Sequence, residues 1–183
     1  STLLAADHAE LGLFEVDEAA LPQVAELVRP RVLALGNLFR DQLDRYGELE
    51  LIAERWRELV HRLPADAQLV VNGDDPQLGD LVRERHDAVV FGLDDRRHAR
   101  PGGLQHAADS KHCVRCGAPY VFHAAYVGHL GEYECPQCGH RRPPLALAAR
   151  EIELNGLDST SFELVVPEGS RRVTLPLPGL YNV

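Results

Sequence analysis

The sequence predicts an α/β protein: a parallel β-sheet with flanking helices, an inserted cysteine lobe and a small C-terminal antiparallel sheet. Three observations support this fold class. Short apolar segments alternate with helical segments as far as residue 93, all four cysteines fall within residues 113–138, and hairpin-like alternation begins at residue 150. Apolar strands separated by helices are typical of parallel sheets, whereas strict alternation is typical of antiparallel ones.

Composition limits the classes of protein to consider. The chain has 183 residues, of which 45% are hydrophobic, and a formal net charge of −9. A chain of this length can bury a core, and its acidity argues against a general nucleic-acid binder. No apolar run approaches the ~20 residues of a membrane span, and no signal peptide is recognisable. Paired cysteines in such a chain favour a metal site in a reducing compartment, so we expect a cytoplasmic protein.

The first half of the chain is expected to alternate helices and strands. The expected order is helix 1–9, strand 11–17, helix 19–28, strand 31–38, a long helix ending near residue 63, a strand from residue 68, helix 77–85 and strand 88–93. Because these strands are apolar throughout, both faces of the sheet are expected to be covered.

Two local signals in this half are specific. Apolar residues recur at steps of three and four along the long helix and predict one buried face that includes Trp56. Asp75 followed by Pro76 predicts the N-cap and first position of the helix that follows.

The sequence pattern changes after Gly92. A polar segment containing Pro-Gly-Gly forms a linker, the cysteine lobe occupies residues 110–143, and alternating segments with Asn-Gly and Glu-Gly turns follow. We therefore expect three parts: an α/β part over residues 1–109, the lobe over 110–143, and an antiparallel part over 144–183.

The four cysteines form two Cys-x-x-Cys-Gly pairs. Cys113 and Cys116 make the first pair, and Cys135 and Cys138 make the second. Four thiolates at this spacing are typical of a zinc ribbon, with an iron–sulfur site of rubredoxin type as the alternative. A site with four protein ligands has no open position for water or substrate, so this zinc is expected to be structural. Catalytic chemistry must then lie in the α/β part.

Polar residues at the ends of the predicted parallel strands are the candidates for that chemistry. Ligands of such sheets bind beyond the carboxyl ends of the strands. Glu15, Asn37 and Asn72 lie at these ends. Each also has an ordinary interpretation, because Glu15 can face solvent at a strand end and asparagine is common in turns. The chain contains no G-x-x-x-x-G-K-[ST] motif, so it should not hydrolyse ATP by itself.

Several motifs in this order resemble one family. FEVDEA, then GNLFRDQLDRYGE, then VNGDDP and finally LPLPGLYNV are similar to the central, ATP-binding domain of the Mur ligases. The four-cysteine insertion and the sequence segment NLFRDQLDRYGEL resemble the MurT branch of that family. The resemblance covers nearly the whole chain and implies the fold of a Mur ligase central domain.

The resemblance also implies a function in peptidoglycan synthesis. Ligases of this branch use ATP to activate the D-glutamate α-carboxylate of lipid II as an acyl phosphate. Ammonia from a GatD-type glutaminase then yields D-isoglutamine, at the inner face of the membrane where lipid II resides. By motif match, Glu15 would be the magnesium ligand and catalytic residue, and Asn72 would contact the adenine. Asn37 and Asp41 would line the substrate or second-metal side.

The same resemblance implies that the site is shared with other segments. The phosphate-binding loop of the family is expected before Ser1 and its C-terminal domain after Val183, so this chain alone is expected to be inactive. A different class of function stays open from the residues themselves: a zinc-ribbon interaction or nucleic-acid-binding module on an α/β carrier. Its support is a mildly basic cluster around the lobe, namely Lys111, Arg115, Arg141 and Arg142.

Overall fold

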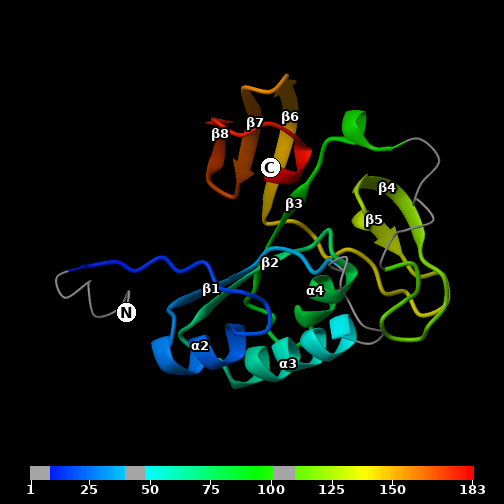
Figure 1. Ribbon diagram of the computed structural model, residues 1–183. Coiled ribbons are helices and arrows are strands. Elements are labelled where there is room, and N and C mark those ends of the chain that lie inside the picture. Colours follow the sequence, from blue (N-terminus) through cyan, green and yellow to red (C-terminus); the bar gives the residue numbers. More distant parts are fainter. Residues whose placement is uncertain (1–8, 40–47, 101–109) are drawn as a thin grey trace.

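The computed structural model describes residues 9–39, 48–100 and 110–183 (Figure 1). The expected helix 1–9 lies almost entirely outside these residues. Within them, three helices and eight strands follow one another, with two short 3-10 turns at 96–98 and 180–182. The elements are α2 (Leu21–Val28), β1 (Val32–Leu35), α3 (Glu48–Arg62), β2 (Gln68–Asn72), α4 (Pro76–Leu81), β3 (Val89–Leu93), β4 (Val121–Val127), β5 (Leu130–Glu134), β6 (Leu147–Asn155), β7 (Ser159–Val166) and β8 (Gly169–Leu175).

The main sheet has six strands in the order β1-β2-β3-β6-β7-β8. β1, β2, β3 and β6 run parallel. β7 then pairs antiparallel with β6, and β8 pairs antiparallel with β7. The predicted parallel and antiparallel strands are therefore both present. They form one continuous mixed sheet, and the smaller two-stranded sheet is instead β4–β5 in the cysteine lobe.

The prediction that helices cover both faces of the sheet is wrong for the described residues. α2, α3 and α4 all pack into one hydrophobic cluster on one side. On β1 the burial alternates, with Leu33 and Leu35 buried and Val32 and Ala34 exposed. The reason is topological. β1, β2 and β3 are adjacent in chain order, so right-handed crossovers place both intervening helices, α3 and α4, on the same face.

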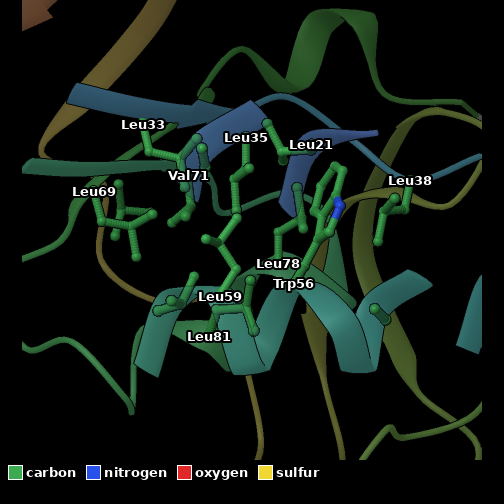
Figure 2. Close-up of a cluster of buried hydrophobic side chains, with 14 residues drawn as sticks. Leu21, Leu33, Leu35, Leu38, Trp56, Leu59, Leu69, Val71, Leu78 and Leu81 are labelled. Atoms are coloured by element: carbon green, nitrogen blue, oxygen red, sulfur yellow. The ribbon is translucent and has the colours of Figure 1, made fainter. Parts of the chain in front are cut away.

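The core lies between this face and α3 (Figure 2). Trp56 and Leu59 of α3 point toward Leu35 and Val71 on the strands, which confirms the predicted buried face of the long helix. The Trp56 indole N–H donates to the carbonyl oxygen of Glu18 at 3.0 Å, and so connects α3 to the segment before α2.

The expected strand over residues 11–17 is not formed. No strand is assigned to these residues, and Leu13 is 96% exposed. β1, the edge strand of the sheet, pairs with β2, and no other described segment is hydrogen-bonded to it as a strand. An apolar segment becomes a strand only where a partner satisfies its backbone groups, and residues 11–17 have none among the described residues.

The predicted helix start at Asp75 is confirmed. Asp75 is the N-cap of α4, its side chain accepts from the Gln77 N–H, and Pro76 occupies the first helical position. α4 ends at Leu81 rather than at residue 85, because single turns replace the helix from residue 82 onward.

We find no helix in the described part of the chain that combines the length and the apolar character needed to cross a bilayer.

Candidate functional site

A cavity of about 280 Å³ opens beyond the carboxyl ends of β1, β2 and β3. This is the edge of a parallel sheet at which ligands are expected. Asn37 follows β1 and Asn72 ends β2, and both line the cavity. Two further walls come from distant parts of the chain. They are Val127 and Leu130 of the cysteine lobe and residues 180–183 at the C-terminus.

The turn after β2 makes polar contacts both within itself and with distant segments. The Asn72 side-chain oxygen accepts from the Asp74 N–H at 3.0 Å, which closes the turn locally. Asp74 is buried, and its Oδ2 accepts from the Leu93 N–H at 2.7 Å. Arg142, near the end of the lobe, donates from Nη1 to Asp74 Oδ1 at 2.8 Å. Burial raises the pKa of the Asp74 carboxyl, although the Leu93 N–H and the charge of Arg142 oppose that rise.

Asp75 connects three segments next to the cavity. Its Oδ1 accepts from Gln77 at the start of α4 and its Oδ2 accepts from the Leu38 N–H, both at 2.8 Å. His129, at the turn between β4 and β5, places Nε2 3.4 Å from the same Oδ2. Asp75 and His129 are both fully buried. The segment that carries Asn37, which is part of the cavity wall, is therefore held through Asp75.

The other candidates from the sequence lie elsewhere. The Glu15 side chain is exposed, on an irregular segment, and it is not among the residues that line the cavity. Asp41 lies outside the described residues. The structure thus brings Asn37 and Asn72 together and leaves Glu15 accessible to solvent.

The four cysteines converge in the lobe. Their Sγ atoms all lie within 4.8 Å of one another, with Cys113 3.5 Å from Cys138 and Cys116 3.5 Å from Cys135. Each pair is followed by a glycine in the left-handed region, Gly117 at φ 76° and Gly139 at φ 74°, which allows the chain to fold tightly around the sulfurs.

The chemistry of this donor set fits one tetrahedral metal ion of zinc type. Burial opposes ionisation of Cys113, but N–H groups of Arg115 and Cys116 outweigh it and lower the pKa of the Cys113 thiol to about 6. In the same cluster, a hydrogen bond from the Ala118 N–H favours the Cys116 thiolate, but burial and the neighbouring sulfurs outweigh it and raise the pKa of Cys116 to about 12. The thiols therefore ionise unequally in the absence of a metal.

A small aromatic core supports the cysteines. Tyr120 and Tyr133 pack with Cys113 and Cys135. His140 lies beside them, and its Nδ1 is 2.6 Å from the Tyr120 hydroxyl. Burial and the charge of Arg115 lower the pKa of His140 to about 4, so its ring is neutral near pH 7.

A buried carboxylate attaches the lobe to the α/β part. Asp80 in α4 accepts from Arg115 on Oδ1 at 2.5 Å and from Arg57 of α3 on Oδ2 at 2.9 Å. Burial opposes ionisation of Asp80, but the hydrogen bonds from Arg115 and Arg57 outweigh it and lower the pKa of the carboxyl.

The sequence analysis did not predict these ion pairs. Arg115 and Arg142, assigned there to a basic cluster around the lobe, instead pair with Asp80 and Asp74. No spacing rule connects residue 74 with 142 or residue 80 with 115. The nearest available signal was Asp74 next to Asp75 in a buried context, which required partners somewhere in the chain.

Comparisons with known proteins agree with the fold and motifs. The Mur ligase middle domain family matches residues 1–135. Subunit MurT of lipid II isoglutaminyl synthase (glutamine-hydrolyzing) from Staphylococcus aureus (strain COL) is 29% identical over 173 residues, which are 94% of this chain and 37% of that protein. The subunit of the same name from Streptococcus pneumoniae (strain ATCC BAA-255 / R6) is 27% identical over 188 residues, covering 100% of this chain and 40% of that protein.

Solved structures show the same fold. A pseudomurein peptide ligase type C from Methanothermus fervidus superimposes with a TM-score of 0.69 at 24% identity, over 88% of this chain and 30% of that one. MurF from Acinetobacter baumannii superimposes with a TM-score of 0.51 at 17% identity, over 89% of this chain and 25% of that one. The chain thus spans well under half the length of each of these relatives. From its motifs, its fold and this match, the chain belongs to the Mur ligase family, as its middle domain.

Proposed function

We propose that this chain is the central, nucleotide-binding part of an ATP-dependent carbon–nitrogen ligase of peptidoglycan synthesis. In this proposal the complete protein amidates the D-glutamate α-carboxylate of lipid II to D-isoglutamine, with ammonia from a GatD-type glutaminase. It would act in the cytoplasm, at the inner face of the membrane. The observation that supports it most is the cavity where the Asn37 and Asn72 segments meet at the carboxyl edge of a Mur ligase sheet. The MurT subunits that match nearly the whole chain supply the substrate class.

The chemistry has two displacements. A carboxylate oxygen attacks the γ-phosphorus of ATP and ADP leaves, giving an acyl phosphate. Ammonia then attacks the acyl carbon, inorganic phosphate leaves, and ammonia loses a proton to give the amide. Neither step needs a nucleophilic side chain, so positioning and charge neutralisation are what the protein has to supply.

The chain's own residues have separable roles in this proposal. Asn72 would hold the adenine at the cavity, and Asn37 and Asp41 would line the substrate or second-metal side. Glu15 would bind magnesium, a hard cation that prefers oxygen ligands and would neutralise charge on the phosphates. Its exposed carboxylate is accessible to such an ion. Cys113, Cys116, Cys135 and Cys138 would hold a structural zinc that closes the lobe over residues 110–143.

The competing interpretation, an interaction module built on the ribbon, is weakened by the same structure. Its basic cluster depended partly on Arg115 and Arg142, and both make ion pairs with buried aspartates of the α/β part.

The test is amidation by the complete protein with its glutaminase partner, lipid II, glutamine, ATP and magnesium, followed by mass spectrometry of the muropeptide. We expect amidated product that disappears without ATP and persists when ammonium chloride replaces glutamine and the glutaminase. Nucleotide turnover with no amide product, whatever the nitrogen source, would overturn the assignment to this branch of the family.

A further inference from the structure

We propose that the β4–β5 hairpin of the cysteine lobe forms one wall of the nucleotide site. In this proposal His129 is a positioning residue, which holds the Asn37 segment in place through Asp75. This inference rests on the proposed function, because it assigns the lobe a part in the same nucleotide site. It goes beyond the expectation that the lobe is purely structural and that the nucleotide site lies in the α/β part alone.

The first support is where the hairpin turn lies. Val127 and Leu130, on either side of the turn, line the cavity together with Asn37 and Asn72. The Gly131 N–H donates to the Asp74 carbonyl oxygen at 2.9 Å, in the turn that follows Asn72. The hairpin therefore lines the cavity and is hydrogen-bonded to the turn that follows β2.

The second support is the environment of His129. Its Nε2 lies 3.4 Å from Asp75 Oδ2, the oxygen that also accepts from the Leu38 N–H. Leu38 directly follows Asn37. A shift of the imidazole would therefore shift the carboxylate that positions the Asn37 segment.

The third support is aromatic packing around the same point. The rings of His129 and Phe39 lie edge to face with centroids 5.1 Å apart, and Phe39 packs on Tyr181 at 5.9 Å. Gly128 is in the left-handed region, and a Cβ there would lie 2.9 Å from the Phe39 ring. The hairpin turn thus fits closely against Phe39, and Phe39 in turn contacts the C-terminal wall of the cavity.

Together these contacts connect the lobe to three segments of the cavity wall, an arrangement that we call the nucleotide clamp. The first is the Asn37 segment, reached through Asp75. The second is the turn after Asn72, reached through Gly131. The third is residue 181, reached through Phe39. The ligand class that this arrangement serves is a nucleoside triphosphate, as in the proposed function.

The experiment compares variants of the complete protein by two readouts. The first is hydrogen exchange of the Leu38 amide, followed by NMR with selective leucine labelling and no nucleotide present. The second is the Kd for a non-hydrolysable ATP analogue with magnesium. For His129→Ala we expect exchange of Leu38 about tenfold faster and nucleotide binding about tenfold weaker, because the buried imidazole no longer packs 3.4 Å from the Asp75 oxygen that accepts from Leu38. His129→Gln, which can place an N–H near the same oxygen, should restore most of both.

Two controls separate positioning from general loss of stability. His123→Ala removes an exposed histidine of the same lobe and should change neither readout. Val60→Ala opens a gap in the core of α3, and should lower the melting temperature without weakening nucleotide binding. Weakening of the Kd by Val60→Ala, to the extent seen in His129→Ala, would overturn the inference.

The outcomes also separate this inference from the proposed function. If the wild-type protein binds nucleotide but His129→Ala leaves Leu38 exchange or the Kd unchanged, this inference alone is overturned. If the wild-type protein binds no nucleotide, the proposed function is overturned and the nucleotide clamp with it.

Discussion

Arg115 donates a hydrogen bond from Nε to Oδ1 of Asp80, and the two atoms are 2.5 Å apart. Arg115 lies between the two cysteines of the first pair, whereas Asp80 lies in α4 and is 1% exposed. The other carboxylate oxygen accepts from Arg57 of α3. A single buried carboxylate therefore joins the lobe to two helices of the α/β part.

Asp80→Asn should destabilise the protein by about 3 kcal/mol near neutral pH, because it leaves Arg57, Arg83 and Arg115 facing a neutral group. Since folding lowers the pKa of this carboxyl, ionised Asp80 stabilises the fold above its unfolded pKa of about 3.9. That contribution is lost as pH falls from there through the lower folded pKa. Chemical denaturation of wild type and variant across this range should show the difference shrinking with acid. The exposed Asp66→Asn serves as control, and an undiminished gap at low pH would contradict the account.

Cys113→Ser should remove most of the bound metal and lower the melting temperature, since the lobe has only a small aromatic core of its own. Metal content by elemental mass spectrometry and thermal unfolding check this. His112→Ala, next to the same cysteine, should retain the metal if the ligands are four thiolates. Full zinc content and an unchanged melting curve in Cys113→Ser would refute the site.

Glu15→Ala should reduce amidation by the complete protein by about a hundredfold or more while leaving unfolding unchanged, because an exposed side chain contributes little to the core. Product formation at saturating ATP, measured over a magnesium titration, checks the role. Glu10→Ala, an exposed carboxylate on the same segment, is the matched control. Normal product formation in Glu15→Ala would rule out the assigned role.

Leu35→Ala should cost about 2–5 kcal/mol of unfolding free energy, because Leu35 is 1% exposed at the centre of the cluster in Figure 2. The control is Leu27→Ala on α2, where the side chain is 82% exposed and a change within about 0.5 kcal/mol is expected. Urea denaturation measures both. Equal costs for the two variants would contradict the position of the core.

Gly131→Ala should destabilise the lobe by about 1–3 kcal/mol, because an added Cβ would collide with the Ala124 carbonyl oxygen across the hairpin. Gly36→Ala is the control for stability, since a Cβ there meets nothing within 4 Å. Thermal unfolding of both variants decides the matter, and a fully stable Gly131→Ala would show that the hairpin tolerates a different pairing.

The parts of the fold that follow local rules were predictable. The Asp75 cap, the buried face of α3 and the alternation of strands and helices each depend on residues within a few positions of one another. The four cysteines were equally readable, because the spacing within each pair is itself the signal.

The parts that depend on distant partners were not predictable. Residues 11–17 have the composition of a strand, but strand formation requires a neighbour that composition does not identify. The one-sided helix layer depends on the spatial order of β1, β2 and β3, not on their sequences. Of the candidate site, the meeting of the Asn37 and Asn72 segments followed from parallel topology. The contributions of His129, Asp80 and Arg142 depend on how the lobe folds back, and no local pattern encodes that.

The parallel pairing of β3 with β6 has a consequence for how the chain folds. Residues 94–146 separate these neighbouring strands, so pairing them closes a long loop. The conformational entropy lost on closing a loop grows with its length. A metal ion bound by Cys113 and Cys138 would cross-link two points within that loop before the strands pair. Metal binding by these cysteines would then shorten the flexible segment that has to close when β6 pairs with β3.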